Sequence, residues 1–132
     1  MIDFLTRRKP LLTDSKRLGR WGERRCEKFL RKKGLKKLAS NYSCRTGEID
    51  LIMVDKSGAI VFVEVKTRKD ESYAAAEDVI TKTKQQRMAR TARYFLSSYN
   101  IQNRPYRFDA VTIVLGHNGR DKINHYQNAF VA

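Results

Sequence analysis

Apolar and small residues recur at helical spacing between residues 15 and 33. Asp14 or Ser15 can cap the first turn of such a helix, and Gly34 ends it. The opposite side of the helical wheel carries mostly Arg and Lys. The pattern therefore predicts an amphipathic helix, whose buried face comprises Leu18, Gly22, Cys26, Phe29 and Leu30.

Three shorter apolar runs follow, and each is typical of a β-strand. They cover about residues 41–45, 49–54 and 60–67. The sequence Asp-Lys-Ser-Gly at residues 55–58 is typical of a turn. The second and third runs are therefore predicted to form an antiparallel hairpin.

The second half of the chain shows a helical pattern of apolar residues followed by two strand patterns. A helix is predicted at about residues 81–98, and strands at about 104–115 and, from a weaker pattern, 122–130. The order α-β-β-β-α-β-β favours the α/β class, with a mixed central sheet flanked by helices. The apolar stripe of the second helix comprises Met88, Ala92, Phe95 and Tyr99.

Three charged residues interrupt the two hairpin strands. Asp50 lies between Ile49 and Leu51, and Glu64 and Lys66 alternate with valines. A buried charge without a partner costs on the order of several kcal/mol. We therefore interpret these residues as functional, for instance as the holders of a metal ion at the edge of the sheet.

The hypothesis of a shared site is also a prediction of strand register. Glu64 and Lys66 share one face of their strand, about 6.6 Å apart along it. Asp50 joins that face if it lies opposite Glu64, which requires Val54 opposite Ile60 and a five-residue loop. A loop of two or four residues would instead place the two acids on opposite faces.

Two carboxylates at that spacing raise each other's pKa unless a cation lies between them. Oxygen ligands of this kind suit Mg²⁺ or Mn²⁺, which polarise a phosphodiester and activate a bound water. Lys66 could orient or deprotonate that water, or neutralise charge on the phosphate. Glu23, at the margin of the first helix, is a candidate third ligand, directly or through water. The plainer alternatives are a surface ion pair for Glu64 and Lys66 and a rim salt bridge for Glu23.

The net charge points to the partner. The 132 residues include 28 Lys and Arg against 14 Asp and Glu, a formal charge of +14. Such a balance favours a polyanionic partner, and the basic residues are spread through predicted elements, which favours nucleic acid. An anionic membrane surface or a ribosome-like assembly are the alternatives.

Other sequence features narrow the class further. No apolar run reaches the ~18 residues that span a bilayer. Residues 1–14 form a basic lead-in that we expect to be flexible and not a secretory signal, followed by a single domain at residues 15–132. Cys26 and Cys44 make no disulfide framework or zinc-ligand spacing, which favours a cytoplasmic protein with reduced thiols.

The arrangement of four residues resembles the PD-(D/E)XK nuclease superfamily, which has the restriction endonuclease-like fold. Asp50 matches its first acidic motif, Glu64-Val65-Lys66 its second, and Glu23 the glutamate on the preceding helix. More closely, the chain is similar to the YraN-like family of uncharacterised bacterial proteins. That resemblance covers nearly everything from residue 16 onward, through Gly19-Arg20-Trp21-Gly22-Glu23, the stretches at residues 41–52 and 61–68, and Arg107-Phe108-Asp109.

The resemblance implies a Mg²⁺-dependent or Mn²⁺-dependent endonuclease that acts on structured or branched DNA, similar to archaeal Holliday-junction resolvases. Glu23, Asp50, Glu64 and Lys66 would be catalytic, and the three acids would hold the metal. The helix after the Glu-x-Lys motif would turn a polar residue toward the site, and Lys84, Gln85 and Gln86 all remain open. For Glu48, metal contact and a second-shell or structural role are both open, and Gln85 is a further second-shell candidate.

Two interpretations of the whole chain follow. In the first, Arg45, Arg68, Lys82, Lys84 and Arg87 contact phosphates and position DNA without reading its sequence. Resolvases usually act as dimers, so a homodimer is compatible with this interpretation. In the second, the chain is a nucleic-acid-binding or assembly protein with a vestigial site, and its binding weakens steeply with salt.

Overall fold

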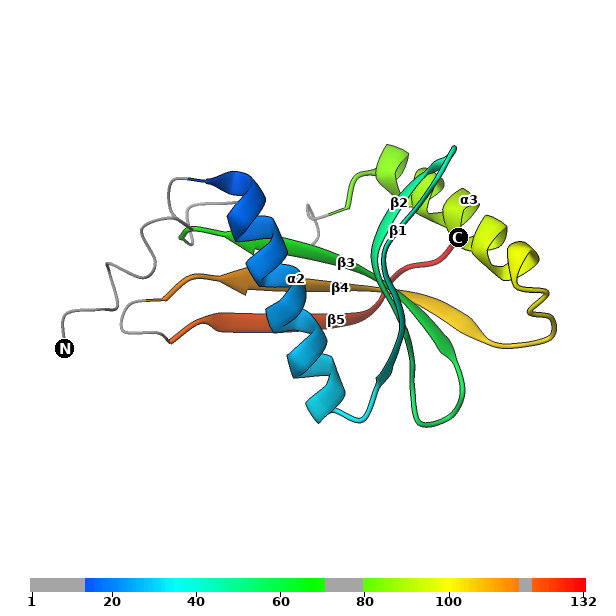
Figure 1. Ribbon diagram of the computed structural model, residues 1–132, viewed down its shortest axis with the longest axis horizontal. Helices are drawn as coiled ribbons and strands as arrows, with labels where there is room; N and C mark the ends of the chain where they lie inside the picture. Colours follow the sequence, from blue (N-terminus) through cyan, green and yellow to red (C-terminus); the bar gives the residue numbers. More distant parts are fainter. Residues whose placement is uncertain (1–13, 71–79, 117–119) are drawn as a thin grey trace.

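The computed structural model describes residues 14–70, 80–116 and 120–132, which form five strands and two helices (Figure 1). The elements, in chain order, are α2 (Ser15–Lys32), β1 (Lys36–Cys44), β2 (Gly47–Val54), β3 (Ile60–Arg68), α3 (Lys82–Ser98), β4 (Tyr106–Val114) and β5 (Lys122–Phe130). The predicted order of elements is confirmed. The prediction for residues 1–14 lies outside the described residues, except for Asp14, whose side chain caps α2.

The five strands form one mixed sheet in the order β1-β2-β3-β4-β5. β3 and β4 are parallel, with α3 between them in the chain, and the other neighbours are antiparallel. The predicted α/β class with a mixed central sheet and flanking helices is therefore confirmed.

The two helices pack with separate hydrophobic clusters. Cys26 and Leu30 of α2 pack with β2, β3 and β4 residues such as Val63 and Val111. Met88, Ala92 and Phe95 of α3 belong to a cluster that also contains Ile52, Phe62 and Phe108. In Figure 1, α2 crosses β3, β4 and β5 at an angle, away from α3. The predicted core positions of both helices are buried, except for Phe29, which is partly buried, and Tyr99, which is 64% exposed because the helix ends at Ser98.

The loop between β2 and β3 has the predicted length. Val54 pairs with Ile60, so the loop runs over the five residues from Asp55 to Ala59. Asp55 Oδ1 accepts hydrogen bonds from the backbone N–H groups of Ser57 and Ala59 and from the Ser57 hydroxyl. The Ser57 hydroxyl is the largest of the effects that lower the pKa of Asp55 to about 2. One ionised side chain thus holds the turn in the register that the shared site requires.

The strands β2 and β3 separate at the far end of the hairpin. Their pairing stops at Leu51 and Val63, while β2 remains paired with β1 as far as Gly47. Over the same stretch β3 stays paired with β4 to its end. Figure 1 shows β1 and β2 curling away from β3 and β4. Asp50 and Glu64 are the next residues beyond the last pair, so they lie where the sheet opens.

A close approach of α2 to β3 brings a third acid toward this opening. A Cβ atom on Gly22 would lie 1.8 Å from the Thr67 hydroxyl oxygen, so only glycine permits this helix-to-sheet distance. Glu23 follows directly in the helix. The buried side of α2 is therefore pressed against the strand that carries Glu64 and Lys66.

Candidate active site

Asp50 replaces a missing backbone partner where the two strands separate. Its Oδ2 accepts the backbone N–H of Val65 at 2.8 Å, a group that the β2–β3 ladder no longer pairs. A buried N–H without an acceptor would cost about 1–3 kcal/mol. The bond satisfies Val65 and fixes the Asp50 carboxyl beside β3, with its other oxygen left for further contacts.

Asp50 and Glu64 face one another. Burial, the hydrogen bond with Glu64 and the charge of Glu64 raise the pKa of Asp50 to about 8. The Glu64 residue is only 2% exposed. Near pH 7 the Asp50 carboxyl therefore holds a proton beside Glu64, as expected for an acid that faces another acid without a cation between them.

Two lysines approach the same oxygen of Glu64. Lys66 Nζ lies 3.7 Å from Glu64 Oε2, and the ammonium of Lys84, from the first turn of α3, contacts that oxygen directly. Burial lowers the pKa of Lys66, and the charge of Lys84 adds to this effect against the opposing charge of Glu64. For Lys84 burial acts in the same direction, but the hydrogen bond and charge of Glu64 raise its pKa overall.

Glu23 lies beside this cluster. Burial raises the pKa of its carboxyl, a hydrogen bond from Asn41 opposes the shift, and the charges of Glu48 and Glu64 add to it. Glu48 itself is exposed on β2, opposite Ser43. Among the described residues, no three His, Cys, Asp or Glu side chains are grouped to hold a metal ion. The structure thus brings Asp50 and Glu64 together directly and leaves Glu23 at their margin.

The remaining candidates divide by their contacts. Of the three α3 candidates left open by the sequence, Lys84 is the one in contact with an acid of the site. Gln85 instead donates to the backbone oxygen of Ile80, and Gln86 is exposed. Among the predicted phosphate contacts, Arg68 is partly buried, and three are exposed: Arg45, Lys82 and Arg87.

The donor set fits a hard divalent cation. Glu64 Oε2 is buried, and two ammonium groups lie near it, Lys84 in direct contact and Lys66 at 3.7 Å. The facing Asp50 carboxyl has a strongly raised pKa. Two facing carboxyl groups that need positive charge beside them have the oxygen chemistry that Mg²⁺ and Mn²⁺ prefer.

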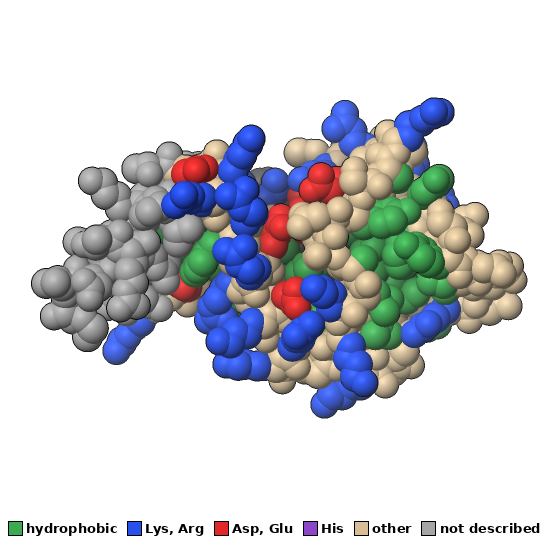
Figure 2. Space-filling view, viewed as in Figure 1, with side chains coloured by type: hydrophobic (Ala, Val, Ile, Leu, Met, Phe, Trp, Pro, Cys, Tyr) green, Lys and Arg blue, Asp and Glu red, His purple; other side chains and the backbone are tan. Residues whose placement is uncertain are grey.

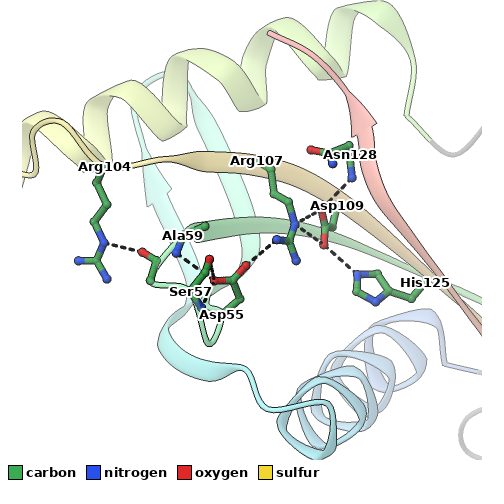
Figure 3. Close-up of polar contacts among 9 residues, drawn as sticks. Asp55, Ser57, Ala59, Arg104, Arg107, Asp109, His125 and Asn128 are labelled. Carbon is green, nitrogen blue, oxygen red and sulfur yellow. Dashed lines mark hydrogen bonds and ion pairs between the residues drawn. The ribbon is translucent and has the colours of Figure 1, made fainter.

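A second buried carboxylate cluster lies elsewhere on the sheet and was not predicted as a site (Figure 3). Asp109 of β4 is fully buried, and three groups donate to its oxygens. Arg107 Nε donates at 3.0 Å, His125 Nε2 at 2.8 Å and the Asn128 backbone N–H at 3.1 Å. Every oxygen of this carboxylate therefore has a partner within the protein.

The Asp109 cluster connects distant parts of the fold. Arg107 Nη1 also donates to Asp55 Oδ2 at 2.7 Å, which links β4 to the loop between β2 and β3. Lys33, after the end of α2, donates to His125 Nδ1 at 2.8 Å. Because an ammonium can only donate, His125 Nδ1 is an acceptor and Nε2 carries the hydrogen that binds Asp109. These contacts join the end of α2, the β2–β3 loop, β4 and β5.

Basic and acidic side chains are mixed on one face of the molecule. Figure 2 shows Lys and Arg side chains spread over α2 and along the upper and lower margins of this face, with acidic side chains among them. Hydrophobic side chains gather toward the end of the molecule where β1 and β2 curl away.

The two cysteines lie in different surroundings. Cys26 is fully buried under α2, and burial, with the charges of Asp50 and Glu23, raises the pKa of its thiol to about 12. Burial also acts to raise the pKa of Cys44, but hydrogen bonds from Thr46, Thr91 and the Gly47 backbone lower it overall. The prediction that Cys26 is a small core residue is confirmed.

Comparison with known structures finds partial overlaps with two nucleases. A repair endonuclease from Pyrococcus abyssi overlaps 65% of this chain and 32% of its own, at 23% identity and a TM-score of 0.32. The EndoMS–dsDNA complex overlaps 57% of this chain and 26% of its own, at 19% identity and a TM-score of 0.29. The chain therefore spans about a third or less of these proteins.

Within the described residues, no helix combines the length and apolarity needed to cross a membrane.

Sequence relatives match over nearly their whole length. The UPF0102 protein of Symbiobacterium thermophilum is 42% identical over 118 residues, which cover 89% of this chain and 99% of the relative. Those of Herpetosiphon aurantiacus and Alkaliphilus metalliredigens are 37% and 39% identical, over 86% and 88% of this chain and 94% and 99% of the relatives. Residues 22–113, which include all four predicted catalytic residues, match the family itself. The chain belongs to the uncharacterised protein family UPF0102.

Proposed function

We propose that this protein is a Mg²⁺-dependent endonuclease that hydrolyses phosphodiester bonds of structured or branched DNA. The observation that carries the proposal is the convergence of Asp50 and Glu64 where β2 and β3 separate. Burial and their proximity raise the pKa of Asp50, and Glu64 draws positive charge from two lysines, an arrangement that is costly in a site with no ligand. A divalent cation between the two acids would supply that charge.

The proposal gives each residue of the cluster a separate task. Asp50 and Glu64 would hold the ion, and Glu23 would reach it through water. When bound, Mg²⁺ would polarise the phosphodiester and lower the pKa of a coordinated water. The Val65 N–H keeps the Asp50 carboxyl in place for this role.

Lys66 is the proposed acid–base or charge-neutralising group. It lies two residues after Glu64 on β3, 26% exposed, with a pKa lowered by burial and by Lys84. A lysine with a lowered pKa is a better proton acceptor near neutral pH than an exposed one. It also remains close enough to the acids to stabilise charge on a phosphate that reaches the ion.

The net charge of +14 supports nucleic acid as the partner. Arg45, Lys82 and Arg87 are exposed and able to contact phosphates. Arg68 and Lys84 would add contacts nearer the acids. Such contacts position a duplex without reading its bases, which is consistent with recognition of DNA shape.

The ion pair between Lys84 and Glu64 favours a second candidate function. A lysine that neutralises the acid can also be part of a purely structural ion cluster. In that case the protein binds nucleic acid, or takes part in an assembly, without cutting. Its binding would weaken steeply with salt, and no divalent metal would produce cleavage.

The test is cleavage of a labelled four-way DNA junction, beside linear duplex and single strand, with Mg²⁺ or Mn²⁺. The wild type is compared with Asp50→Ala and Glu64→Ala, and Glu27→Ala is the control, because it removes an acid of α2 that pairs with Arg31 and Lys37 instead. We expect metal-dependent cutting of the junction that both site variants lose and the control retains. Binding without cutting under either metal would contradict the nuclease and support the second function.

A further inference from the structure

Lys84 makes the contact that a metal ion would have to replace. Its ammonium touches Glu64 Oε2, an oxygen that is buried. Lys66 is near the same oxygen, at 3.7 Å. The oxygen is therefore occupied by positive charge from the protein while no divalent ion is bound.

The two lysines differ in how easily their ammonium groups can move away from Glu64. Lys66 is on β3 itself, two residues from Glu64, and its side chain is 26% exposed. Lys84 comes from a different element, the first turn of α3, and its side chain is 39% exposed. A long and flexible lysine side chain at a helix surface can swing into water without moving the backbone.

The carboxyl groups cannot move as easily. Asp50 is held by the Val65 N–H, and the Glu64 side chain is 3% exposed within the sheet. A cation that binds between them must therefore compete with the ammonium at Glu64, because both positive groups need the same oxygen. Electrostatic repulsion between them favours the departure of the more mobile group.

We propose that Lys84 occupies the cation position at Glu64 and has to be displaced before a divalent metal binds. The inference rests on the metal site of the proposed function and goes beyond it, because it makes Lys84 an internal competitor of the metal. Once displaced, the Lys84 ammonium is free to contact a phosphate beside the acids. Lys84 then serves two states of one site, closing it without metal and contributing to it with metal.

The experiment measures Mn²⁺ binding by calorimetry, at low ionic strength and without nucleic acid. Wild type is compared with Lys84→Met, which keeps most of the side-chain volume and removes the charge. Lys84→Arg keeps the charge, and Lys28→Met removes a charge from the exposed face of α2. Thermal unfolding of each variant checks that the fold is retained.

We expect Lys84→Met to bind Mn²⁺ about tenfold more tightly than wild type, since a unit charge at contact distance is removed. Lys84→Arg should stay within about twofold of wild type, and Lys28→Met should be unchanged. Equal or weaker Mn²⁺ binding by a folded Lys84→Met would overturn the inference, as would the absence of Mn²⁺ binding in every variant. Tighter Mn²⁺ binding without any DNA cleavage would support it while contradicting the nuclease.

Discussion

Two buried carboxylate clusters lie on the same sheet and differ in one respect. Each oxygen of Asp109 receives donors from the protein, namely Arg107, His125 and the backbone at Asn128. Asp50 and Glu64 instead face one another, burial and Glu64 raise the pKa of Asp50, and the positive charge at Glu64 comes from Lys84 and Lys66, whose side chains are partly exposed. The first cluster is closed by largely buried donors, and the second by lysine side chains that can move away.

The comparison teaches how to interpret an acid inside an apolar strand. The same sequence signal, one carboxylate among large apolar residues, occurs at both places. Burial alone requires a partner, and the partner can be a neighbouring side chain or an external ligand. The cluster of two facing acids is thus the better candidate for function, and the Asp109 cluster for stability.

The largest difference between the two clusters should be in the free energy of unfolding, when Asp109 is replaced. Asp109→Asn leaves Arg107 and His125 facing a neutral group, and we expect a loss of about 3 kcal/mol in the free energy of unfolding. Urea unfolding followed by circular dichroism measures it. A loss below about 1 kcal/mol would show that this cluster is not a structural centre.

Divalent ions should act on the other cluster. At ten times its dissociation constant at pH 9, Mg²⁺ should raise the unfolding free energy of wild type by about 1.4 kcal/mol. At the same Mg²⁺ concentration the gain should be smaller at pH 6, because the Asp50 proton competes with the ion and weakens its binding. Thermal melts with and without Mg²⁺ test this. Asp109→Asn should keep the gain and Asp50→Asn should lose it, and a gain that survives in Asp50→Asn would place the ion elsewhere.

Asp50→Asn should change stability in the direction opposite to Asp109→Asn. Asn keeps an oxygen for the Val65 N–H and removes a charge from the facing acids, so we expect a gain of about 1 kcal/mol near pH 8. The wild-type pKa is about 8 when folded and about 3.8 when unfolded, so the folded state binds more protons between these values. Stability from this group should therefore fall as pH rises from 4 to 8, and be level above 8.

Metal-free denaturant titrations across pH 4 to 9 measure this slope. The matched comparison is Glu27→Gln, which neutralises an acid outside the site and should keep the wild-type slope. An Asp50→Asn curve that still falls as steeply as wild type would mean that another group carries the pH dependence.

A last effect should come from Asp55, which links the two regions. Its pKa is lowered to about 2, so its contribution is complete above pH 4 and is lost as pH falls toward 2. Asp55→Asn should therefore reduce stability at neutral pH, and should reduce the loss between pH 4 and 2. Acid titration of both proteins by fluorescence of Trp21 tests it. Identical acid curves would contradict the role of Asp55.

The sequence was sufficient for the order of elements and for the hairpin, because both follow from local patterns. Helical spacing located α2 and α3, and the Asp-Lys-Ser-Gly turn located the hairpin, but Val54 opposite Ile60 was a condition of the shared-site hypothesis, which the strand pairing meets. That register brought Asp50 and Glu64 to the same opening, as predicted. Their roles as metal ligands stay predictions.

Other features depend on contacts that no local pattern carries. Periodicity could not show that Lys84, not Gln85, reaches Glu64, because the rotation of α3 on the sheet decides this. The separation of β2 from β3 depends on how β1 and β2 curl. The partners of Asp109 are 16 and 19 residues away in the chain at His125 and Asn128, so spacing alone did not reveal them.

The contrasting thiols have a practical consequence. Because the thiolate is the reactive form, Cys44 with its lowered pKa should be alkylated at neutral pH well before Cys26, whose pKa is about 12. Cys26 lies between α2 and the sheet, so a reagent reaches it when the helix lifts. The rate at which Cys26 is alkylated therefore reports how often α2 opens locally beside the acids, and the rate of Cys44 serves as the reference within the same protein.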